Sequence, residues 1–464
     1  MKQNINLGII SLGCPKNTAD TENILSLLSK KLKLNTQFHA FRRDKNKNYP
    51  VRPSFSLTNP ESADIVLINT CGFLKAARDE VFENIREFKN KKIIIIGCLA
   101  GKFTRQDLIK YPQVFAVVTE KNYQKLPEII KRITRNKKVY EVSEEPFKFI
   151  KTFGKSIITP RSYAYVKIAE GCNNRCSYCL IPHLKGRYRS RKMEEILDEA
   201  KMLIKKGVKE LILVAQDCGY YGQDLNKKDS RVRKITLSVL LQKLEKIPVD
   251  FWIRILYVYP ERITDELLHV IANSKKICRY LDIPLQHGDA KILKAMNRGS
   301  IPELIIKKIE KIRKIIPRIA LRTSLITGFP GEKEENFKNL VKFLKQINFD
   351  HVGVFEYSRE PGTAAYGLPG QVSKNIKSLR RAELMRLQQK ISLAHNKSFV
   401  SKTFKTLIER FDPQANIYIG RTTRLSPEID GEVIIKSAKK LQLNSFQKIK
   451  ITKTSEYDLY GIEN

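Results

Sequence analysis

The sequence predicts a three-part α/β protein, and three observations lead to this fold class. Apolar runs alternate with helical patterns over residues 1–145, as in an N-terminal α/β layered domain. Six more strand-like runs alternate with helical patterns over residues 155–395, which predicts a central partial (β/α)6 barrel. Residues 401–464 hold short alternating runs separated by turn signals, which predicts a small antiparallel, OB-like β-barrel.

The N-terminal domain is built on apolar runs that are typical of buried parallel strands. These runs are 5–14, 63–73, 91–100 and 114–120, and helical patterns include 21–32 and 126–133. A polar stretch with two prolines at 42–54 predicts a loop or an insertion.

Three cysteines of this domain share one kind of position. Cys14, Cys71 and Cys98 each lie at the C-terminal end of a predicted strand. Ligands of open α/β sheets bind at this edge, so three cysteines there indicate a shared site.

The central domain follows an aperiodic stretch, 143–160, which we interpret as a linker. Its predicted strands are 163–171, 210–217, 251–258, 280–287, 320–329 and 351–358. A single long helix is predicted over 373–400. Active sites of such barrels gather at the C-terminal ends of the strands, and a cysteine-rich loop follows the first strand there.

Composition narrows the class of protein. The chain has 464 residues, of which 42% are hydrophobic, and no apolar run reaches the roughly 18 residues of a membrane span. The N-terminus lacks the pattern of a signal peptide. We therefore expect a cytoplasmic protein without membrane contact, whose eight cysteines are reduced and suited to metal ligation or catalysis.

The net charge of +38 admits two interpretations. Residues 1–150 carry 27 basic and 15 acidic side chains, 151–399 carry 48 and 25, and 400–464 carry 11 and 8. Such an excess favours polyanionic partners such as ribosomal RNA. A lysine-rich compositional bias on solvated faces explains scattered lysines equally well.

The loop "EGCNNRCSYC" places Cys172, Cys176 and Cys179 in a C-x3-C-x2-C spacing. A structural zinc site needs four ligands, and His183 could complete a Cys3His set. Redox chemistry of the C-x2-C type leaves Cys172 unexplained. An iron–sulfur cluster suits clustered thiolates, and three cysteines on a 4Fe-4S cluster leave one iron open to a small molecule.

This spacing, with Tyr178 before the last cysteine, resembles the signature of the radical S-adenosylmethionine (SAM) enzymes. The resemblance implies a 4Fe-4S cluster held by the three catalytic cysteines, with SAM bound at the open iron. It also implies that one electron from the cluster cleaves SAM to a 5′-deoxyadenosyl radical, the chemistry being the cofactor's.

Further motifs resemble the methylthiotransferases within that superfamily. "SLGCPKN", "NTCGF" and "GCLA" contain Cys14, Cys71 and Cys98, which in that family hold a second, auxiliary 4Fe-4S cluster. The C-terminal barrel resembles the family's TRAM domain. The resemblance implies that a methylthio group is inserted at an unactivated C–H bond, with SAM supplying both the methyl group and the radical.

Two branches of this family compete. "YLDIPLQH", "LITGFPGE", "YSREPGTAAY" and "SPEIDG" resemble the RimO-like branch, which modifies the β-carbon of an aspartate in the twelfth protein of the small ribosomal subunit. The other branch methylthiolates adenosine in tRNA. The acidic residues Glu428, Asp430 and Glu432 in the small barrel favour a basic protein loop over phosphates as the partner.

A non-catalytic, metal-stabilised protein that binds the ribosome or RNA is the alternative from another class. The enzyme reading also implies an external electron donor, such as a reductase or a flavodoxin-type protein, and a sulfur donor.

Other site residues follow from the resemblance. Tyr178, Gln286, Gly328 and Gly331 are expected near SAM. His287 is expected either near SAM or substrate, or in a structural role. Arg187, Arg189 and Arg191 could bind the carboxylate of SAM or an anionic substrate, or form an exposed basic loop. Cys218 and Cys278 are expected to be buried apolar residues.

Overall fold

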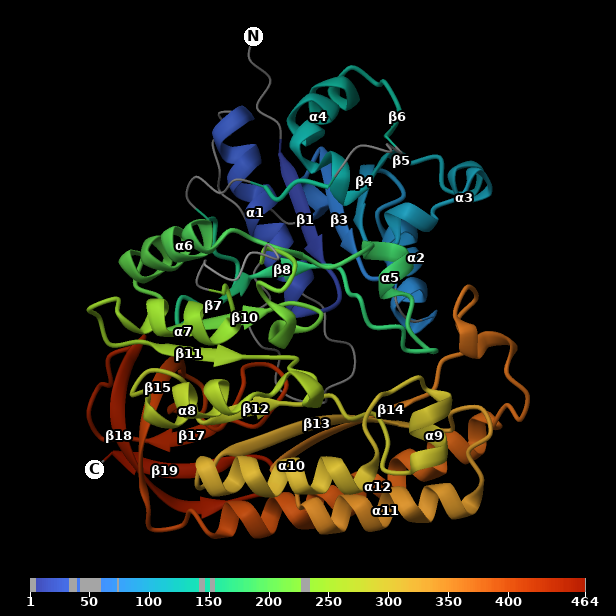
Figure 1. The fold of residues 1–464 in the computed structure, drawn as a ribbon. Coiled ribbons are helices and arrows are strands. Elements are labelled where there is room, and N and C mark those ends of the chain that lie inside the picture. Colours follow the sequence, from blue (N-terminus) through green and yellow to red (C-terminus); the bar gives the residue numbers. More distant parts are fainter. Residues whose placement is uncertain are drawn as a thin grey trace. The chain divides into compact units, whose positions relative to one another are not determined.

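The computed structural model describes residues 6–32, 40–41, 60–72, 75–141, 147–150, 155–226 and 234–463 (Figure 1). These residues form two compact units. The first comprises the chain up to Ile158 together with His183–Gly186, and the second comprises the remainder. The predicted loop at 42–54 lies outside the described residues. None of the helices in the described ranges has the length and apolar character needed to cross a membrane.

The first unit contains a six-stranded parallel sheet in the order β2-β1-β3-β4-β5-β6. The strands are β1 (Leu7–Ser11), β2 (Ala40–Phe41), β3 (Ile65–Thr70), β4 (Lys92–Gly97), β5 (Val114–Val118) and β6 (Val139–Glu141). The four predicted strands are confirmed. β2 and β6 are too short for their periodicity to be recognised in the sequence.

Helices cover both faces of this sheet. They are α1 (Pro15–Leu32), α2 (Lys75–Glu87), α3 (Arg105–Lys110) and α4 (Leu126–Thr134). α1 and α4 pack on the face that carries Ile9 and Leu67, whereas α2 packs on the face that carries Ile10. α1 begins six residues before the predicted helix, because Pro15 suits the first helical position, where no backbone N–H is needed.

The described part of the predicted linker lacks helices and strands and is fixed to α1. The Lys155 ammonium lies 3.0 Å from Glu22 Oε2, and both side chains are fully buried. The backbone N–H of Ser156 donates to Ser26 Oγ at 2.8 Å, and that of Ile158 donates to Glu22 Oε1. The linker is therefore anchored to the first unit by a buried ion pair.

The second unit contains the predicted partial barrel, and all six strand predictions are confirmed. The strands form two parallel sheets, β11-β10-β7 and β12-β13-β14. They are β7 (Tyr163–Lys167), β10 (Glu210–Val214), β11 (Trp252–Ile255), β12 (Tyr280–Asp282), β13 (Ala320–Thr327) and β14 (His351–Glu356). Where β11 of one sheet meets β12 of the other, the N–H of Val258 donates to the carbonyl of Asp282 at 2.9 Å. The six strands therefore follow one another in sequence order.

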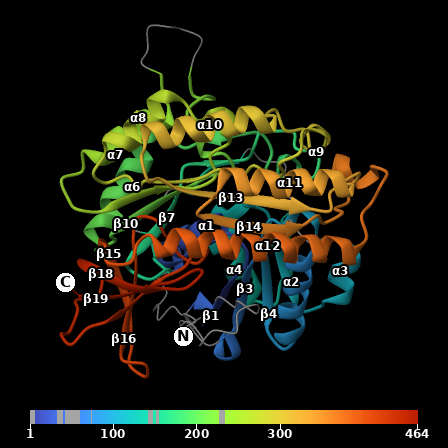
Figure 2. The same ribbon diagram turned by 90° about the horizontal axis from the view of Figure 1, so that it is seen from below.

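Helices surround these strands. They are α5 (Ile181–Lys185, grouped with the first unit from His183 on), α6 (Met193–Lys205), α7 (Leu237–Glu245), α8 (Asp265–Asn273), α9 (Ala290–Ala295), α10 (Pro302–Ile315), α11 (Glu334–Ile347) and α12 (Lys374–Lys397). A short ribbon of β8 (Ala169–Glu170) and β9 (Arg189–Ser190) lies beside β7 in sequence. Figure 2 shows α10, α11 and α12 side by side, and α12 confirms the predicted long helix.

The C-terminal residues of the second unit form a closed five-stranded barrel in the order β15-β16-β17-β19-β18. The strands are β15 (Thr403–Asp412), β16 (Ile417–Arg421), β17 (Val433–Lys436), β18 (Ser445–Thr454) and β19 (Leu459–Glu463). β17 and β19 pair in parallel, whereas the other four pairs are antiparallel. A closed ring with an odd number of strands cannot be antiparallel throughout, so one parallel pair is required. The predicted small antiparallel barrel is otherwise confirmed.

A buried ion cluster joins the small barrel to the partial barrel. Arg421 Nη2 lies 2.6 Å from Glu210 Oε2 and 2.7 Å from Glu409 Oε1, and Arg254 Nε lies 2.6 Å from Glu210 Oε1. Burial alone would raise the pKa of Glu210, yet the charges of Arg254 and Arg421 hold it below its usual range. Two cations and two anions balance here, so each charge depends on the others.

The acidic residues expected to face a basic substrate loop are used within this unit instead. The hydroxyls of Tyr163 and Tyr165 donate to the Glu428 carboxylate at 2.8 and 3.1 Å. The Tyr280 hydroxyl donates to Asp430 Oδ2 at 2.8 Å. These tyrosines lie at or near the starts of β7 and β12, so the small barrel packs on the N-terminal ends of the partial-barrel strands. Glu428 and Asp430 therefore stabilise the fold, so they give no support to a basic protein loop as the partner.

Glu210→Gln is expected to lower the free energy of unfolding by about 3–5 kcal/mol, because it leaves two buried arginines facing a single remaining carboxylate. Thermal or urea unfolding of the full chain measures this loss. Lys405→Gln is the matched control, since the Lys405–Asp250 pair also joins the two barrels but is about half exposed. Its loss should cost only about 0–1 kcal/mol. Equal stability losses in the two variants would contradict the buried cluster.

Candidate functional site

The loop that carries Cys172, Cys176 and Cys179 begins where β8 ends, at the C-terminal side of β7. Backbone groups inside the loop already approach two of the sulfurs. The N–H of Asn174 donates to Cys172 Sγ, and the N–H of Ile181 donates to Cys179 Sγ, each at 3.4 Å. Such N–H···S contacts favour the thiolate form, which is the form that binds metal.

The loop is held from outside by the segment that contains α9. The N–H of Ser177 donates to the carbonyl of Met296 at 3.0 Å, and its hydroxyl donates to the carbonyl of Ala295 at 2.7 Å. The side chain of Asn297 donates to the carbonyl of Arg175 at 2.7 Å. The cysteine loop is therefore a fixed structure rather than a free turn.

Two of the three thiols are shielded from water. Cys172 and Cys176 are 6% and 7% exposed, whereas Cys179 is half-buried. Burial raises the pKa of the Cys172 thiol to about 11. Such a thiol is a poor nucleophile by itself, but metal coordination deprotonates a thiol outright. The donor set therefore fits metal ligation better than thiol catalysis.

The arrangement does not match a site for one metal ion. Within the ranges that the structure describes, no three His, Cys, Asp or Glu side chains are grouped to hold a metal ion. His183, the fourth ligand of the zinc alternative, is exposed on α5. A 4Fe-4S cluster binds each thiolate through a different iron, so its ligands stand further apart than those of one ion.

The surroundings of Cys176 contain two residues that sequence reasoning missed. The Tyr259 hydroxyl lies 3.7 Å from Cys176 Sγ, and Arg298 Nη1 donates to the same sulfur at 3.7 Å. The guanidinium of Arg298 also stacks on the Tyr259 ring, 4.1 Å from its centroid.

Cys14, Cys71 and Cys98 of the first unit follow the adjacent strands β1, β3 and β4. Glycines let their loops approach one another. A Cβ on Gly13 would lie 2.8 Å from Cys71 Cβ, and a Cβ on Gly72 would lie 2.9 Å from the carbonyl carbon of Cys98. The three cysteines are therefore gathered at one sheet edge, as the sequence predicts.

Polar side chains from the same motifs hold these three loops together. The side-chain amide of Asn17 donates to the carbonyls of Leu12 and Thr70 at 2.9 and 3.0 Å. The side-chain amide of Asn69 donates to the carbonyl of Asn17 at 2.8 Å, and the N–H of Leu99 donates to Thr70 Oγ1 at 3.1 Å. Each cysteine loop is thereby bonded to its neighbour.

His287 makes contacts that stabilise the fold of the second unit. It is fully buried, and the N–H of Asp289 donates to its Nδ1 at 3.0 Å. Its Nε2 lies 3.3 Å from Glu332 Oε2. Glu332 also accepts from Gly328 N–H at 2.9 Å and from Arg380 at 2.7 Å. Glu332 thus fixes the "TGFPGE" loop between β12 and α12.

The residues expected near SAM differ in their surroundings. Tyr178 packs against a core cluster formed by Ile292, Met296, Phe329, Tyr357 and Ala365, which joins the cysteine loop to the "TGFPGE" loop.

Gln286 has φ +75°, a strained value for a residue with a side chain. Gly331 has φ +83° and open space where a Cβ would lie, whereas a Cβ on Gly328 would lie 2.2 Å from Lys377 Cγ. Gly331 therefore has open space beside its Cα, with its N–H donating to the carbonyl of Gly370 at 2.9 Å, while Gly328 is required by the approach of α12.

Among the three arginines, Arg191 is committed to the fold. It is buried, and its Nη1 donates to Glu199 Oε2 at 2.6 Å and to the carbonyl of Lys167 at 2.8 Å. Arg187, in contrast, is exposed. Cys218 and Cys278 are 0% and 1% exposed, and burial raises the pKa of Cys278 to about 12, as expected for thiols that serve as buried apolar groups.

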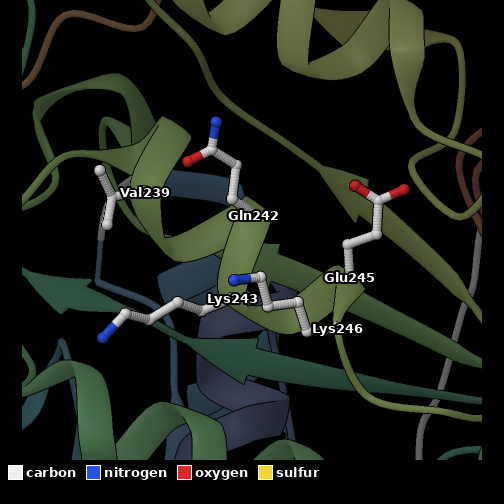
Figure 3. A pocket seen from close by; sticks show the side chains of 5 residues that line it. All are labelled: Val239, Gln242, Lys243, Glu245 and Lys246. Atoms are coloured by element: carbon white, nitrogen blue, oxygen red, sulfur yellow. The ribbon is translucent and has the colours of Figure 1, made fainter.

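A hollow on the surface of the second unit is a different feature. It is lined by Val239, Gln242, Lys243, Glu245 and Lys246 of α7 and the residue after it. Figure 3 shows these side chains leaving the helix in separate directions. None of the predicted site residues lines it, so it is not the candidate active site.

Comparison with known sequences identifies three regions of the chain. The Radical SAM superfamily matches residues 166–344, the TRAM domain matches 400–462, and Uncharacterized protein family UPF0004 matches 54–120. The first match contains the cysteine loop of the second unit. The third contains Cys71 and Cys98.

Curated relatives match almost the whole chain. "Ribosomal protein uS12 methylthiotransferase RimO" of Thermoanaerobacter sp. (strain X514) is 43% identical over 463 residues, covering 98% of this chain and 99% of the relative. The protein of the same name from Acetivibrio thermocellus is 41% identical over 98% of this chain and 97% of the relative. Among solved structures, the radical S-adenosylmethionine methyltransferase TsrM from Kitasatospora setae has a TM-score of 0.51 at 14% identity, covering 78% of this chain and 77% of TsrM. That likeness concerns the fold alone.

Proposed function

Because this chain belongs to the RimO family of ribosomal protein uS12 methylthiotransferases, we propose that it adds a methylthio group to the β-carbon of an aspartate in that ribosomal protein. The chain is a radical SAM enzyme that uses an iron–sulfur cluster and SAM. The observation that carries the proposal is the placement of six cysteines in two sets of three, each set at the C-terminal side of parallel strands.

We assign the cluster that binds SAM to Cys172, Cys176 and Cys179. Their buried thiols and fixed loop suit a cluster ligated by three cysteines, with one iron left for the cofactor. When bound, the cluster and SAM supply the one-electron chemistry that removes hydrogen from an unactivated carbon. The residues of the chain orient the cofactor and keep water away from it.

A second 4Fe-4S cluster is assigned to Cys14, Cys71 and Cys98. The close approach of their loops at Gly13 and Gly72 supports this assignment. We further assign residues 1–145 to the auxiliary-cluster domain, 155–395 to the radical SAM domain and 401–464 to the TRAM domain. Two clusters explain why one chain carries two separate sets of three cysteines.

SAM is proposed to contact Tyr178, Gln286, Gly328 and Gly331. The shared packing of Tyr178 and the "TGFPGE" loop, and the open space beside the Gly331 Cα, support this placement. We also propose a cytoplasmic location, an electron donor of the reductase or flavodoxin type, a sulfur donor, and contact with ribosomal RNA through the basic surface.

Glu332→Gln is expected to weaken SAM binding about tenfold, or about 1.4 kcal/mol, because it removes the charge that fixes the "TGFPGE" loop. Equilibrium binding of SAM to reconstituted protein measures this change. Glu334→Gln is the matched control, since Glu334 pairs with the same Arg380 at 3.3 Å but is 66% exposed. A larger loss of SAM affinity in Glu334→Gln than in Glu332→Gln would contradict the proposed role of Glu332 in fixing this loop.

The product assay tests the function itself. The protein is purified without oxygen, reconstituted with iron and sulfide, and incubated with SAM, a reductant and either ribosomal protein uS12 or tRNA. A mass gain on the aspartate peptide of uS12 supports the proposal. A gain only on tRNA adenosine would move the chain's substrate to tRNA, and bound zinc without iron would favour the non-catalytic alternative.

A further inference from the structure

Arg298 is a buried cation without an acidic partner. The residue is 9% exposed, and of the described residues no carboxylate forms an ion pair with its guanidinium. Its contacts are Cys176 Sγ at 3.7 Å, the Tyr259 ring, and the carbonyl of Pro284, which accepts from Nη2. All of these partners are neutral while the Cys176 thiol is protonated.

A buried charge of this kind requires a counter-charge. Leaving an ion unpaired away from water costs several kcal/mol, so buried charges in proteins are paired or face a metal centre. The tyrosine ring and the Pro284 carbonyl stabilise the cation only in part. The sulfur of Cys176 becomes a full anion when it is a metal-bound thiolate, whereas burial raises the pKa of the Tyr259 hydroxyl well above its usual range and keeps it neutral.

We infer that Arg298 is a positioning residue that balances the negative charge of the cluster held by Cys172, Cys176 and Cys179 and raises its reduction potential. This inference rests on the proposed function, because it requires a cluster at these cysteines. Reduction brings one electron from the external donor protein to the cluster, with no bond made or broken. The more negative reduced form gains more from a nearby cation than the oxidised form does.

The geometry favours the cluster over the carboxylate of SAM as the partner of Arg298. The guanidinium is held on three sides, by the ring of Tyr259, the carbonyl of Pro284 and the sulfur of Cys176. The Tyr259 hydroxyl also reaches the same sulfur, at 3.7 Å. Hydrogen bonds to ligating sulfurs are among the factors that set the potentials of iron–sulfur clusters.

The test is a redox titration of the reconstituted full chain, followed by electron paramagnetic resonance without SAM. For Arg298→Met we expect the ratio of reduced to oxidised cluster to fall at least tenfold at a fixed applied potential, which corresponds to a shift of about 59 mV to more negative values. Arg298→Lys keeps the charge and should remain closer to the wild type. Tyr259→Phe removes a hydroxyl without a change of charge and should shift the potential less than Arg298→Met.

The outcomes separate this inference from the proposed function. An Arg298→Met protein with full iron content and an unchanged potential overturns the inference. So does weaker SAM binding with an unchanged potential, which would make the SAM carboxylate the partner. Loss of the cluster from the methionine variant but not from the lysine variant supports the inference. A wild-type protein that forms no cluster would instead overturn the proposed function.

Discussion

Replacing Cys176 by alanine is expected to abolish the cleavage of SAM to 5′-deoxyadenosine and, with it, all methylthiolation. Cys176 is one of only three proposed protein ligands of the SAM-binding cluster, and it is buried beside Arg298 and Tyr259. Its removal takes away a ligand and leaves the guanidinium without a counter-charge. We expect a loss of at least about a thousandfold, or about 4 kcal/mol in the barrier, measured by chromatography of deoxyadenosine.

Cys218→Ala is the matched control for this variant. Cys218 is also a buried cysteine of the second unit, and its Sγ donates to the carbonyl of Leu213 at 3.6 Å. We expect it to retain SAM cleavage and to lose only a small amount of stability. Persistent SAM cleavage by Cys176→Ala would refute the assignment of Cys172, Cys176 and Cys179.

The second large effect is expected for Cys71→Ala, which should abolish product formation without abolishing SAM cleavage. Cys71 belongs to the first unit, where Gly13 and Gly72 bring its loop against its neighbours. Without this ligand the auxiliary cluster should be lost, so methylthiolated uS12 should fall below detection. Cleavage of SAM should continue, because the cysteines of the second unit are unchanged.

Iron content and the two products measured together check this separation. We expect the Cys71→Ala protein to hold about half of the wild-type iron and to form deoxyadenosine without product. Thr104→Ala is a suitable control from the same unit, since Thr104 caps the exposed end of α3 and its loss should cost about 1 kcal/mol of stability. Full product formation by the Cys71 variant would leave the auxiliary cluster without support.

The positions of the six cysteines could be predicted because they follow from local patterns. Each lies after an apolar run, and the ends of parallel strands meet at one edge. Arg298 could not be found in this way, because it meets Cys176 across 122 residues of sequence. The sequence carries no periodic signal for a contact between two loops.

Other differences also have physical reasons. The role of His287 depends on Glu332 and Arg380, which lie on two other segments and become its neighbours only in the folded protein. The acidic residues of the small barrel looked available in the sequence. Glu428 and Asp430 in fact accept hydrogen bonds from buried tyrosines of β7 and β12. Burial of polar pairs of this kind is decided by tertiary packing rather than by local sequence.

The ion cluster around Glu210 has a consequence for how the small barrel can be studied. Deleting residues 401–464 would expose Tyr163 and Tyr280 to solvent. It would also remove Arg421 from Glu210, and the Thr423 carbonyl from Arg254. A truncated chain would therefore report on misfolding rather than on substrate docking. Point substitutions on the solvent-facing lysines of β18, such as Lys448 and Lys450, are the informative way to ask what this module touches.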